Sequence, residues 1–363
     1  MMKHKILSAC KVLCVSSVAM MCASAPGYAE TFKLTFASGF PPVIGSTATI
    51  INAFLPGVNA ELEAMGSEHR VDWNVAVSGS LAGLPAILDV TRDGIADVAE
   101  LGVTFEPNRL PLTNIGYIAP FATSDHKVAT LAVDSLIRTM PAMQQEWEQH
   151  GLVYLAGFAI EKYVLMSKNP VDSLDDLRGQ KVGVAGININ WLDGTGAVGV
   201  LTAFGTAYND LKTGVVESVI VPMIGGTGIK LYEVAPYATR VEFGSMFQGG
   251  IVVNKARWDS FPDDVRTAMT KSAAAFQEQY FKNVDGALKK AEEAYVAGGG
   301  TFVDLPAEER QKWAGNLKGF PAKWAKPLED RGLPAREVLS RFMDYQRAHS
   351  ETVLVDWDKV SAN

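Results

Sequence analysis

The sequence predicts an α/β protein built as two lobes, and two observations indicate it. Short apolar strands alternate with amphipathic helices between residues 32 and 254, an order that produces mostly parallel sheets with helices on their faces. The pattern occurs twice, and 363 residues favour two lobes over one. A long helical pattern and a helical, tryptophan-containing segment follow. We therefore expect two α/β lobes, a long helix and a C-terminal helical tail.

The first 29 residues are typical of an export signal. Lys3 and Lys5 precede a mainly apolar run over 12–25, and the tripeptide 27–29 (GYA) has small residues at the two positions that determine cleavage. We expect cleavage near Ala29 and export of the mature protein. Residues 7–10 (LSAC) resemble a lipoprotein box, but almost no apolar sequence precedes them.

The composition excludes several classes of function. Cys10, Cys14 and Cys22 all lie in the export signal, so the mature chain offers no disulfide, thiolate metal site or cysteine nucleophile. A formal net charge of −7 argues against nucleic-acid binding, which depends on clustered positive charge. No later stretch long enough to span a membrane is free of charge. We expect a soluble mature protein without cofactor or metal.

The first lobe is predicted from the patterns up to residue 160. Strands are expected at 32–37, 71–77, 96–101 and 152–158, and helices at 47–64, 85–92 and 134–150. Pro56 is a candidate kink in the first helix. The strand–helix–strand spacing favours a parallel sheet with right-handed crossovers. Polar turns at 38–42 and 78–81 follow the first two strands.

The second lobe is organised around residues 170–191. Asp172 or Ser173 can cap a short helical turn that Gly179 ends, and a buried strand over 181–185 stops at Gly186. Polar residues just past a strand's end are where open α/β sheets bind ligands, so we expect a small molecule to be held here without chemistry. The remaining pattern predicts strands at 163–167, 217–222 and 248–254, a helix at 208–213 and a continuation of the α/β pattern at 197–204.

A long helix is expected at 263–296, and residues from 306 onward are predicted to be helical. This last segment contains Trp313, Trp324 and Trp357. Large aromatic side chains mostly occupy cores. We therefore expect these tryptophans to anchor a tail packed across the lobes rather than to bind a ligand.

Two motifs were weighed as sites of chemistry. Residues 194–199 (GTGAVG) fit a dinucleotide fingerprint, but a polar loop separates them from the preceding strand, so the start of a small-residue helix is favoured. His126 beside Asp125 could be one arm of a hydrolase triad, but the chain has no G-x-S-x-G nucleophile motif. We expect no catalytic residue, and the pattern favours a binding protein.

Several short motifs are distributed over nearly the whole mature chain: 34–37 (LTFA), 89–97 (DVTRDGIAD), 176–182 (DLRGQKV), 207–217 (AYNDLKTGVVE), 230–234 (KLYEV), 253–255 (VNK) and 258–262 (WDSFP). Together they resemble the DctP-type substrate-binding proteins of TRAP transporters. The resemblance implies a two-lobed, type II-like periplasmic binding protein fold with a hinge, a long bridging helix and closure around a ligand. It also implies a periplasmic location, small and large membrane subunits as partners, and uptake driven by an ion gradient.

The expected boundaries follow from these patterns and the resemblance. We place the export signal at 1–29, lobe I at 30–160 plus 249–288, lobe II at 161–248 plus 289–320, and the tail at 321–363. We expect a monomer.

The ligand site departs from the pattern of the family it resembles. That family usually has an arginine in a G-x-K-x-R-V strand, where its guanidinium holds a ligand carboxylate in a bidentate pair. Here the position is Gly183, a second common arginine position falls on Tyr163, and the E-N-P turn is replaced by 220–222 (IVP). The usual carboxylate clamp is therefore missing, and an unclamped buried carboxylate costs several kcal/mol by desolvation alone.

Three ligand chemistries are compatible with this altered site. The first is a neutral or mostly apolar ligand held by aromatic and amide groups. The second is an acid held by Lys162, Arg240 or the backbone N–H groups of 78–81; the third is a cation facing Glu100 or Glu161. For each aromatic residue, core packing is the alternative role. The candidate ligand residues are Phe40, Ser78, Ser80, Glu100, Tyr163, Gly183, Asn188, Asn190, Trp191, Tyr208, Met223, Phe243 and Phe247.

The sequence thus predicts a solute receptor of a TRAP-type transporter that captures a small organic solute, and not an enzyme. A sensor that delivers ligand to a signalling receptor is one alternative. An exported enzyme that uses His126 or Glu161 is another, and an ABC-type receptor is a third, against which 208–217 and 230–234 argue. Because the clamp is missing, C4-dicarboxylates such as succinate are expected not to stabilise the protein.

Overall fold

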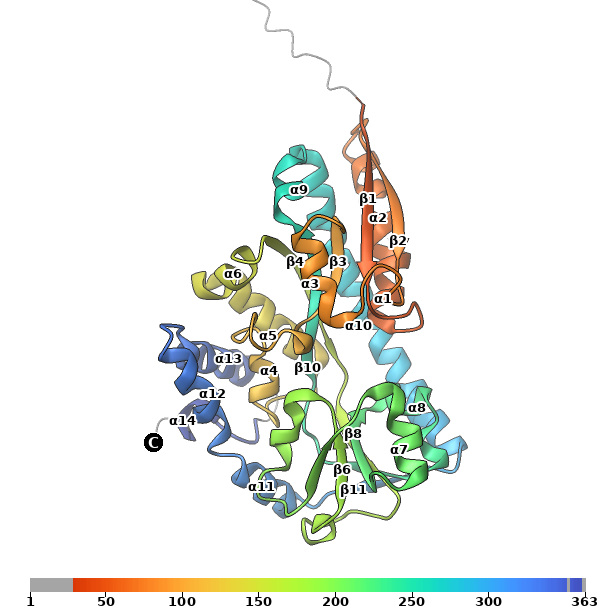
Figure 1. The fold of residues 1–363 in the computed structure, drawn as a ribbon, viewed down its shortest axis with the longest axis vertical. Helices are drawn as coiled ribbons and strands as arrows, with labels where there is room; N and C mark the ends of the chain where they lie inside the picture. The colour runs from red at the N-terminus through yellow and green to blue at the C-terminus, as the bar shows by residue number, and fades with distance from the viewer. Residues whose placement is uncertain (1–28, 351–352, 361–363) are drawn as a thin grey trace, which may run out of the picture.

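The computed structural model describes residues 29–350 and 353–360. The predicted export signal therefore lies outside the described residues, except for Ala29. The chain forms two sheets, one in each of two lobes that are stacked along the long axis of the molecule (Figure 1). This arrangement is the predicted two-lobed α/β fold.

Lobe I contains a five-stranded mixed sheet in the order β2-β1-β3-β10-β4. β1 runs parallel to β2 and β3, whereas β10 runs antiparallel to β3 and β4. The strands are β1 (Thr31–Ser38), β2 (Arg70–Ala76), β3 (Val98–Gly102), β4 (Leu152–Ile160) and β10 (Met246–Asn254). The helices are α1 (Gly45–Thr49), α2 (Leu55–Ala64), α3 (Ile87–Arg92), α4 (Ile115–Ile118), α5 (His126–Thr139), α6 (Pro141–Glu148) and α9 (Lys255–Ser260).

Lobe II contains a six-stranded sheet in the order β11-β9-β5-β8-β6-β7, in which β6 runs parallel to β7 and β8. The strands are β5 (Tyr163–Ser167), β6 (Lys181–Val184), β7 (Val198–Leu201), β8 (Ser218–Pro222), β9 (Tyr237–Arg240) and β11 (Thr301–Asp304). Its helices are α7 (Ala207–Thr213) and α8 (Met223–Gly228), and short 3-10 segments include η5 (Gly186–Leu192).

The long helix α10 (Asp263–Ala297) runs along both lobes (Figure 1). Its 35 residues span about 52 Å at the standard rise of an α-helix. The N-terminal part packs against α2 in lobe I, and later turns pack against α8 and β11 in lobe II. The expected bridging helix is therefore present.

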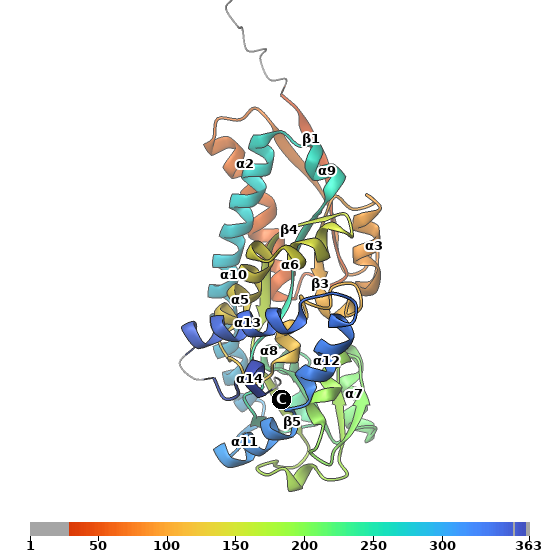
Figure 2. The ribbon, with the colours of Figure 1, turned by 90° about the vertical axis from the view of Figure 1, so that its left-hand side faces the viewer.

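The tail consists of α11 (Ala307–Asn316), α12 (Phe320–Glu329), α13 (Ala335–His349) and α14 (Trp357–Val360), which lie across one side of both lobes (Figure 2). The indole of Trp313 donates to the carbonyl of Trp191 in lobe II, and that of Trp357 donates to the carbonyl of Pro120 in lobe I. Both indoles are fully buried. The prediction that the tryptophans anchor the tail is confirmed for these two residues.

Two local predictions were wrong. The single helix expected at 134–150 is two helices, because Asp125 caps α5 by accepting from the N–H groups of Lys127 and Val128, and Pro141 starts α6. Residues 198–201 form the edge strand β7 instead of a helix start. Near Pro56, the expected kink takes the form of a π-helical segment over Ile50–Phe54 between α1 and α2.

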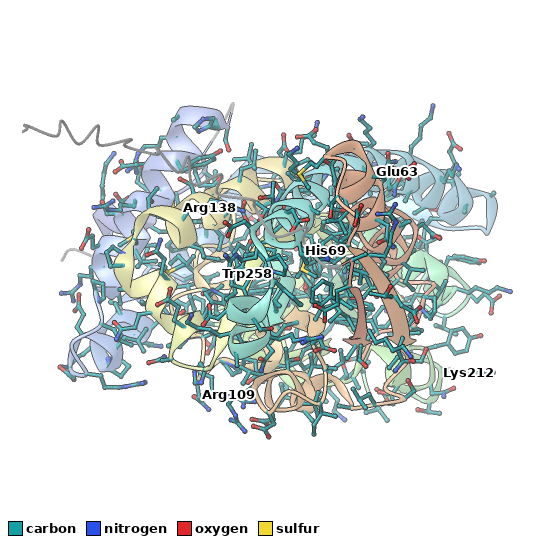
Figure 3. The ribbon with its side chains drawn as sticks, turned by 90° about the horizontal axis from the view of Figure 1, so that it is seen from above. Glu63, His69, Arg109, Arg138, Lys212 and Trp258 are labelled. Atoms are coloured by element: carbon teal, nitrogen blue, oxygen red, sulfur yellow. The ribbon has the colours of Figure 1, made fainter. Side chains whose placement is uncertain are left out.

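Charged side chains lie on the outer surface of the described part of the chain. In the view from above, the side chains of Glu63, Arg109 and Lys212 lie at the outer edge of the molecule (Figure 3). Within residues 29–350 and 353–360, no helix has the length and apolar character needed to cross a membrane.

Candidate ligand site between the two sheets

In each lobe, the parallel strands end at the same edge of the sheet. The strand-end edge of lobe I faces that of lobe II. In Figure 1, α1 of the upper lobe lies above α7 and α8 of the lower lobe. Three segments follow β1, β2 and β3, at 39–44, 77–83 and 103–105; three follow β6, β7 and β8, at 185–192, 202–206 and 223–229, of which the last consists mostly of the short helix α8. We call these six segments the inter-lobe loops. Open α/β sheets bind ligands at such strand ends.

The six inter-lobe loops contain no Asp, Glu, Lys, Arg or His. They instead expose large apolar side chains from both lobes. Leu81 and Phe105 of lobe I are each 37% exposed, and Phe204 of lobe II is 40% exposed. Val43 and the strand-end residue Leu201 are also exposed. The six segments themselves are therefore uncharged and partly apolar.

The loops of lobe I are tied to one another by backbone contacts. The Phe40 ring lies 6.2 Å from the Phe105 ring, between centroids, and the N–H of Ser78 donates to the carbonyl of Phe40. The N–H groups of Gly79 and Ser80 donate to the carbonyls of Ser38 and Val77. These three N–H groups are thus already used, so they do not supply the anion-binding turn considered above for 78–81.

Glu100 lies at the end of β3 and is fully buried. Its Oε2 accepts hydrogen bonds from the hydroxyls of Ser38, at 2.7 Å, and Thr47, at 2.6 Å. Its Oε1 has no hydrogen-bond partner among the described residues. Burial raises the pKa of this carboxyl, and nearby serine and threonine hydroxyls oppose the rise.

Glu161 lies in the linker between β4 and β5 and is also buried, with 5% of its surface exposed. Its Oε1 accepts the N–H of Ile224 in the first turn of α8 at 2.7 Å. Burial raises the pKa of Glu161 to about 7, and hydrogen bonds from backbone N–H groups, including that of Gly225, oppose the rise. Glu161 therefore acts as a cap that fixes α8 to the linker.

An aromatic cluster joins η5 of lobe II to α4 of lobe I. The Trp191 ring stacks on Tyr117, with centroids 6.3 Å apart, and contacts the Tyr163 ring edge-on at 5.3 Å. The Trp191 indole donates to the carbonyl of Tyr117 at 3.0 Å. The hydroxyl of Tyr163 lies near the hydroxyl of Tyr117 and near the amide of Asn188. Burial raises the pKa of Tyr163 to about 12. Trp191 is thus a packing residue between the lobes in this conformation.

The two cations considered as a replacement clamp are paired with acids. The Lys162 ammonium lies 3.1 Å from a Glu292 carboxylate oxygen, and Arg240 lies 3.2 Å from Asp304. The Arg240 guanidinium also lies over the Phe302 ring. Neither cation forms an ion pair with Glu100 or Glu161. Their charges are balanced outside the inter-lobe loops.

Gly183 lies inside β6 and is closely packed. A Cβ atom built on it would lie 2.8 Å from Val219 Cγ1 and 3.0 Å from the Thr202 hydroxyl. The glycine therefore leaves no room for a side chain on that face of the sheet. The place where the resembled family carries its arginine is filled here by neighbouring side chains.

The remaining predicted residues divide into two groups. Phe40, Ser78, Ser80, Asn188 and Asn190 lie on or beside the inter-lobe loops, and Asn190 donates to the carbonyl of Ile187. Four others do not join them. The hydroxyl of Tyr208 donates to Glu233, and Phe243 and Phe247 are fully buried in the hydrophobic core; Met223 begins the segment 223–229, but its side chain is also fully buried.

Sequence reasoning missed Tyr117, Phe105 and Phe204. Phe105 and Phe204 follow β3 and β7 as Phe40 follows β1, so the rule that strand ends build the site could have found them. Tyr117 belongs to a segment without clear periodicity, and its hydroxyl donates to Gln248 at 2.9 Å. Only the tertiary structure reveals that contact.

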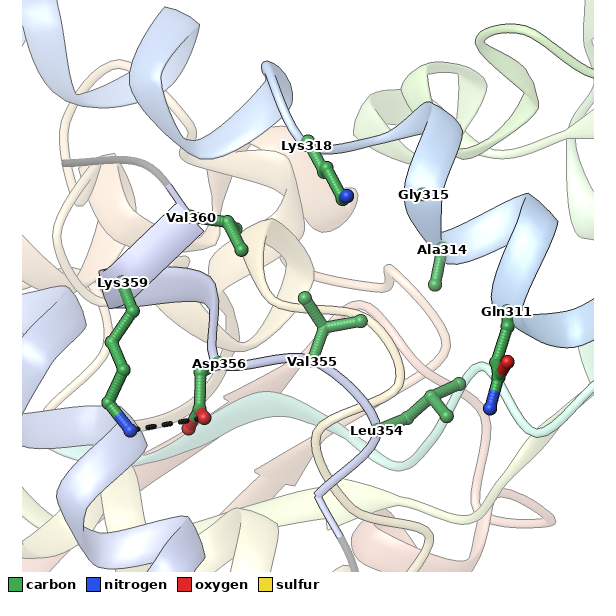
Figure 4. Close-up of a pocket in the computed structure, with 9 residues that line it drawn as sticks. All are labelled: Gln311, Ala314, Gly315, Lys318, Leu354, Val355, Asp356, Lys359 and Val360. Atoms are coloured by element: carbon green, nitrogen blue, oxygen red, sulfur yellow. Dashed lines mark hydrogen bonds and ion pairs between the residues drawn. The ribbon is translucent and has the colours of Figure 1, made fainter. Parts of the chain in front are cut away.

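Other candidate sites lack the chemistry of a catalytic or metal centre. His126 is buried against Phe281, and its Nε2 lies 3.7 Å from Asp285. No group of three metal-ligating side chains occurs in the described part of the chain. A cavity of about 380 Å³ lies between α11 and the segment 354–360, where Lys359 pairs with Asp356 (Figure 4). This cavity contains none of the predicted ligand residues.

Comparisons with known proteins identify relatives of this chain. Residues 45–326 match the family described as bacterial extracellular solute-binding protein, family 7 (DctP). The C4-dicarboxylate-binding periplasmic protein DctP of Rhodobacter capsulatus is 32% identical over 170 residues, which span 46% of this chain and 50% of that protein. This chain therefore matches about half the length of that curated relative.

Solved structures share the fold. A TRAP solute binding protein from a marine metagenome, specific for aromatic acid ligands and co-crystallised with 3-hydroxybenzoate, is 22% identical with a TM-score of 0.76, covering 88% of this chain and 99% of that one. A TRAP solute binding protein from Rhodoferax ferrireducens T118 with copurified benzoate is 19% identical with a TM-score of 0.74, covering 88% and 98%.

Proposed function

The chain belongs to the bacterial extracellular solute-binding proteins of family 7, and we propose that it is a periplasmic solute receptor of a TRAP-type transporter. In this proposal it captures a small organic solute between its two lobes and delivers it to the small and large membrane subunits. The protein is proposed to bind its ligand without catalysis.

The observation that carries the finer proposal is the absence of charge from the inter-lobe loops. These loops offer a ligand carboxylate no arginine or lysine of their own, and the buried acids Glu100 and Glu161 lie beside them. Exposed Phe105, Phe204 and Leu81 offer apolar contact instead. We therefore propose a neutral or aromatic ligand that needs no carboxylate clamp.

The relatives support the receptor role while differing in ligand chemistry. The curated relative is named for C4-dicarboxylates, and two of the structural relatives were solved with benzoate or 3-hydroxybenzoate. Benzoate and 3-hydroxybenzoate each have an aromatic ring, and the exposed apolar side chains of the inter-lobe loops of this chain could pack against such a ring. Closure follows if the ligand binds the closed lobes more tightly than the open ones.

The proposal is tested by asking which small molecule the ligand-free protein binds from a mixture. Residues 30–363 are purified, unfolded to release bound molecules, refolded, and incubated with a library of small organic compounds. Native mass spectrometry should detect one retained solute per chain. A solute present at 100 times its Kd should raise the free energy of unfolding by about 2.7 kcal/mol. Failure to retain any solute, or chemical conversion of the retained one, would contradict the receptor role.

The transport role needs a separate test. Uptake of the recovered solute into vesicles that contain the two membrane subunits should depend on the added receptor. Uptake that is unaffected by the receptor would contradict the transport role but not solute binding.

A further inference from the structure

We infer that the ligand carries a hydrogen-bond donor, a hydroxyl or an ammonium group, which Glu100 accepts in lobe I, and that a second donor of the ligand faces Asn188 in lobe II. This inference rests on the proposed solute-receptor function and names the chemistry of its ligand. It makes Glu100 a specificity-determining residue.

Glu100 is a buried acceptor with unused capacity. Its Oε2 already accepts from Ser38 and Thr47, whereas its Oε1 is without a partner in the described structure. No part of this side chain is exposed, so bulk water does not reach the free oxygen. Buried polar atoms are nearly always hydrogen-bonded, and an exception calls for a partner absent from the chain itself.

Glu100 lies directly beneath two of the inter-lobe loops. The Ser38 hydroxyl that donates to Glu100 also accepts the N–H of Phe40 at 3.0 Å, and the Ser38 carbonyl accepts the N–H of Gly79 at 3.3 Å. One residue therefore connects the carboxylate to the loops at 39–44 and 77–83.

Asn188 offers a comparable acceptor from the other lobe. It is 2% exposed, and its Oδ1 has no partner among the described residues. Tyr163 lies beside it and is close enough to Glu161 for that charge to raise the pKa of Tyr163. Tyr280 is in turn close to both Glu161 and Glu100. The two free acceptors thus come one from each lobe.

The balance of groups in this region favours a donor ligand. Glu100 faces the hydroxyls of Ser38, Ser46 and Thr47 and, at longer range, Tyr280. Within the described part of the chain, it has no lysine or arginine partner. A ligand ammonium or hydroxyl would supply a donor to the free oxygen, whereas a ligand carboxylate would place a further acceptor beside two buried carboxyls.

The test uses four probes of similar size: benzylamine, benzyl alcohol, benzyl methyl ether and benzoate. Their dissociation constants are measured by calorimetry for the mature protein and for Glu100→Gln. Glu146→Gln is the matched control, because Glu146 is buried in lobe I but is saturated by the N–H groups of Leu112 and Thr113.

We expect benzylamine and benzyl alcohol to bind at least tenfold more tightly than the ether and benzoate. Glu100→Gln should reduce benzylamine binding at least tenfold, and Glu146→Gln should leave the order of the probes unchanged. Equal binding of benzyl alcohol and its ether would overturn the inference but leave the receptor role intact. Tightest binding of benzoate, or binding of none of the four probes, would also overturn it.

A second measurement needs no ligand. If Glu100 is kept for a ligand, its unpartnered charge destabilises the empty protein, and Glu100→Gln should raise the thermal midpoint at pH 8. Because burial raises the pKa of Glu100, the wild type should regain this stability as the pH falls, and the difference between the two proteins should shrink. A lower midpoint for Glu100→Gln at pH 8 would show a structural role and contradict the inference.

Discussion

Glu100 in lobe I and Glu161 in the linker between the lobes are buried to nearly the same degree, with 0% and 5% of their surfaces exposed. Glu161 accepts backbone N–H groups at the start of α8, so the fold supplies it with hydrogen-bond donors. Glu100 is held by hydroxyls on one oxygen only. Two carboxylates that are buried to the same degree can therefore have different roles. Their hydrogen-bond partners, and not their burial, distinguish a helix cap from an available acceptor.

The largest expected effect is the loss of the cap at Glu161. Glu161→Ala removes the acceptor of the half-buried N–H groups of Ile224 and Gly225, and each unsatisfied group costs about 1–3 kcal/mol. We expect the free energy of unfolding to fall by about 4 kcal/mol in urea titrations at pH 7. Glu161→Gln keeps an oxygen at the same place and is the control. If both substitutions have the same small effect, Glu161 is not a cap.

The pH dependence of stability separates the two carboxylates further. Burial raises the pKa of Glu161 to about 7, above the ordinary value of 4.5, so its contribution to stability is present below pH 4.5 and is lost as the pH rises through 7. Relative to Glu161→Gln, the wild type should lose about 3 kcal/mol between pH 4.5 and 8. Glu146, whose pKa burial also raises to about 7, is unchanged in both proteins. Parallel stability curves for the two proteins would contradict this expectation.

Installing a cation at Gly183 tests whether the missing arginine alone explains the uncharged inter-lobe loops. The added side chain would collide with Val219 and Thr202, so Gly183→Arg should lower the free energy of unfolding by about 1–3 kcal/mol. Because those atoms fill the space, we expect no gain of succinate binding in calorimetry. Gly183→Ala should show a smaller loss of the same sign. A stable Gly183→Arg protein that binds succinate would show that the loops can accept the clamp.

The smallest effect on stability is expected at the exposed aromatic residues of the inter-lobe loops. The double substitution Phe105→Ala and Phe204→Ala should change the free energy of unfolding by less than about 0.5 kcal/mol, because both rings are partly exposed. The affinity for an aromatic solute should fall about tenfold, which corresponds to about 1.4 kcal/mol. Leu131→Ala on α5, with 36% exposure, is the control and should not change affinity. An unchanged affinity in the double variant would place the ligand elsewhere.

The order of strands and helices could be predicted from the sequence because local patterns specify it. Alternating apolar residues identified β1, a short buried run identified β6, and helical periodicity identified α10 to within one residue at its end. The small elements β9, α8 and α9 were missed, since short segments carry little periodicity. The break between α5 and α6 could have been predicted from Pro141, because proline starts helices more readily than it continues them.

The site was predicted less completely than the fold. Glu100 and Asn188 follow the rule of polar residues near strand ends, and both remain candidates. Trp191 satisfies the same rule, but its ring packs on Tyr117, which lies 74 positions earlier in the chain. The sequence pattern does not distinguish an aromatic side chain that faces a ligand from one that joins two lobes, because both positions require a large, buried ring.

The central claim is that the inter-lobe loops select against a ligand carboxylate, and matched amide and acid pairs test it most directly. Thermal unfolding of the refolded mature protein is followed with benzamide, benzoate, succinamide and succinate at equal concentration and constant ionic strength. The account predicts that an amide raises the midpoint and that its acid does not. A larger rise with benzoate or succinate than with the corresponding amide would contradict the claim and require a cation that reaches the ligand between the lobes.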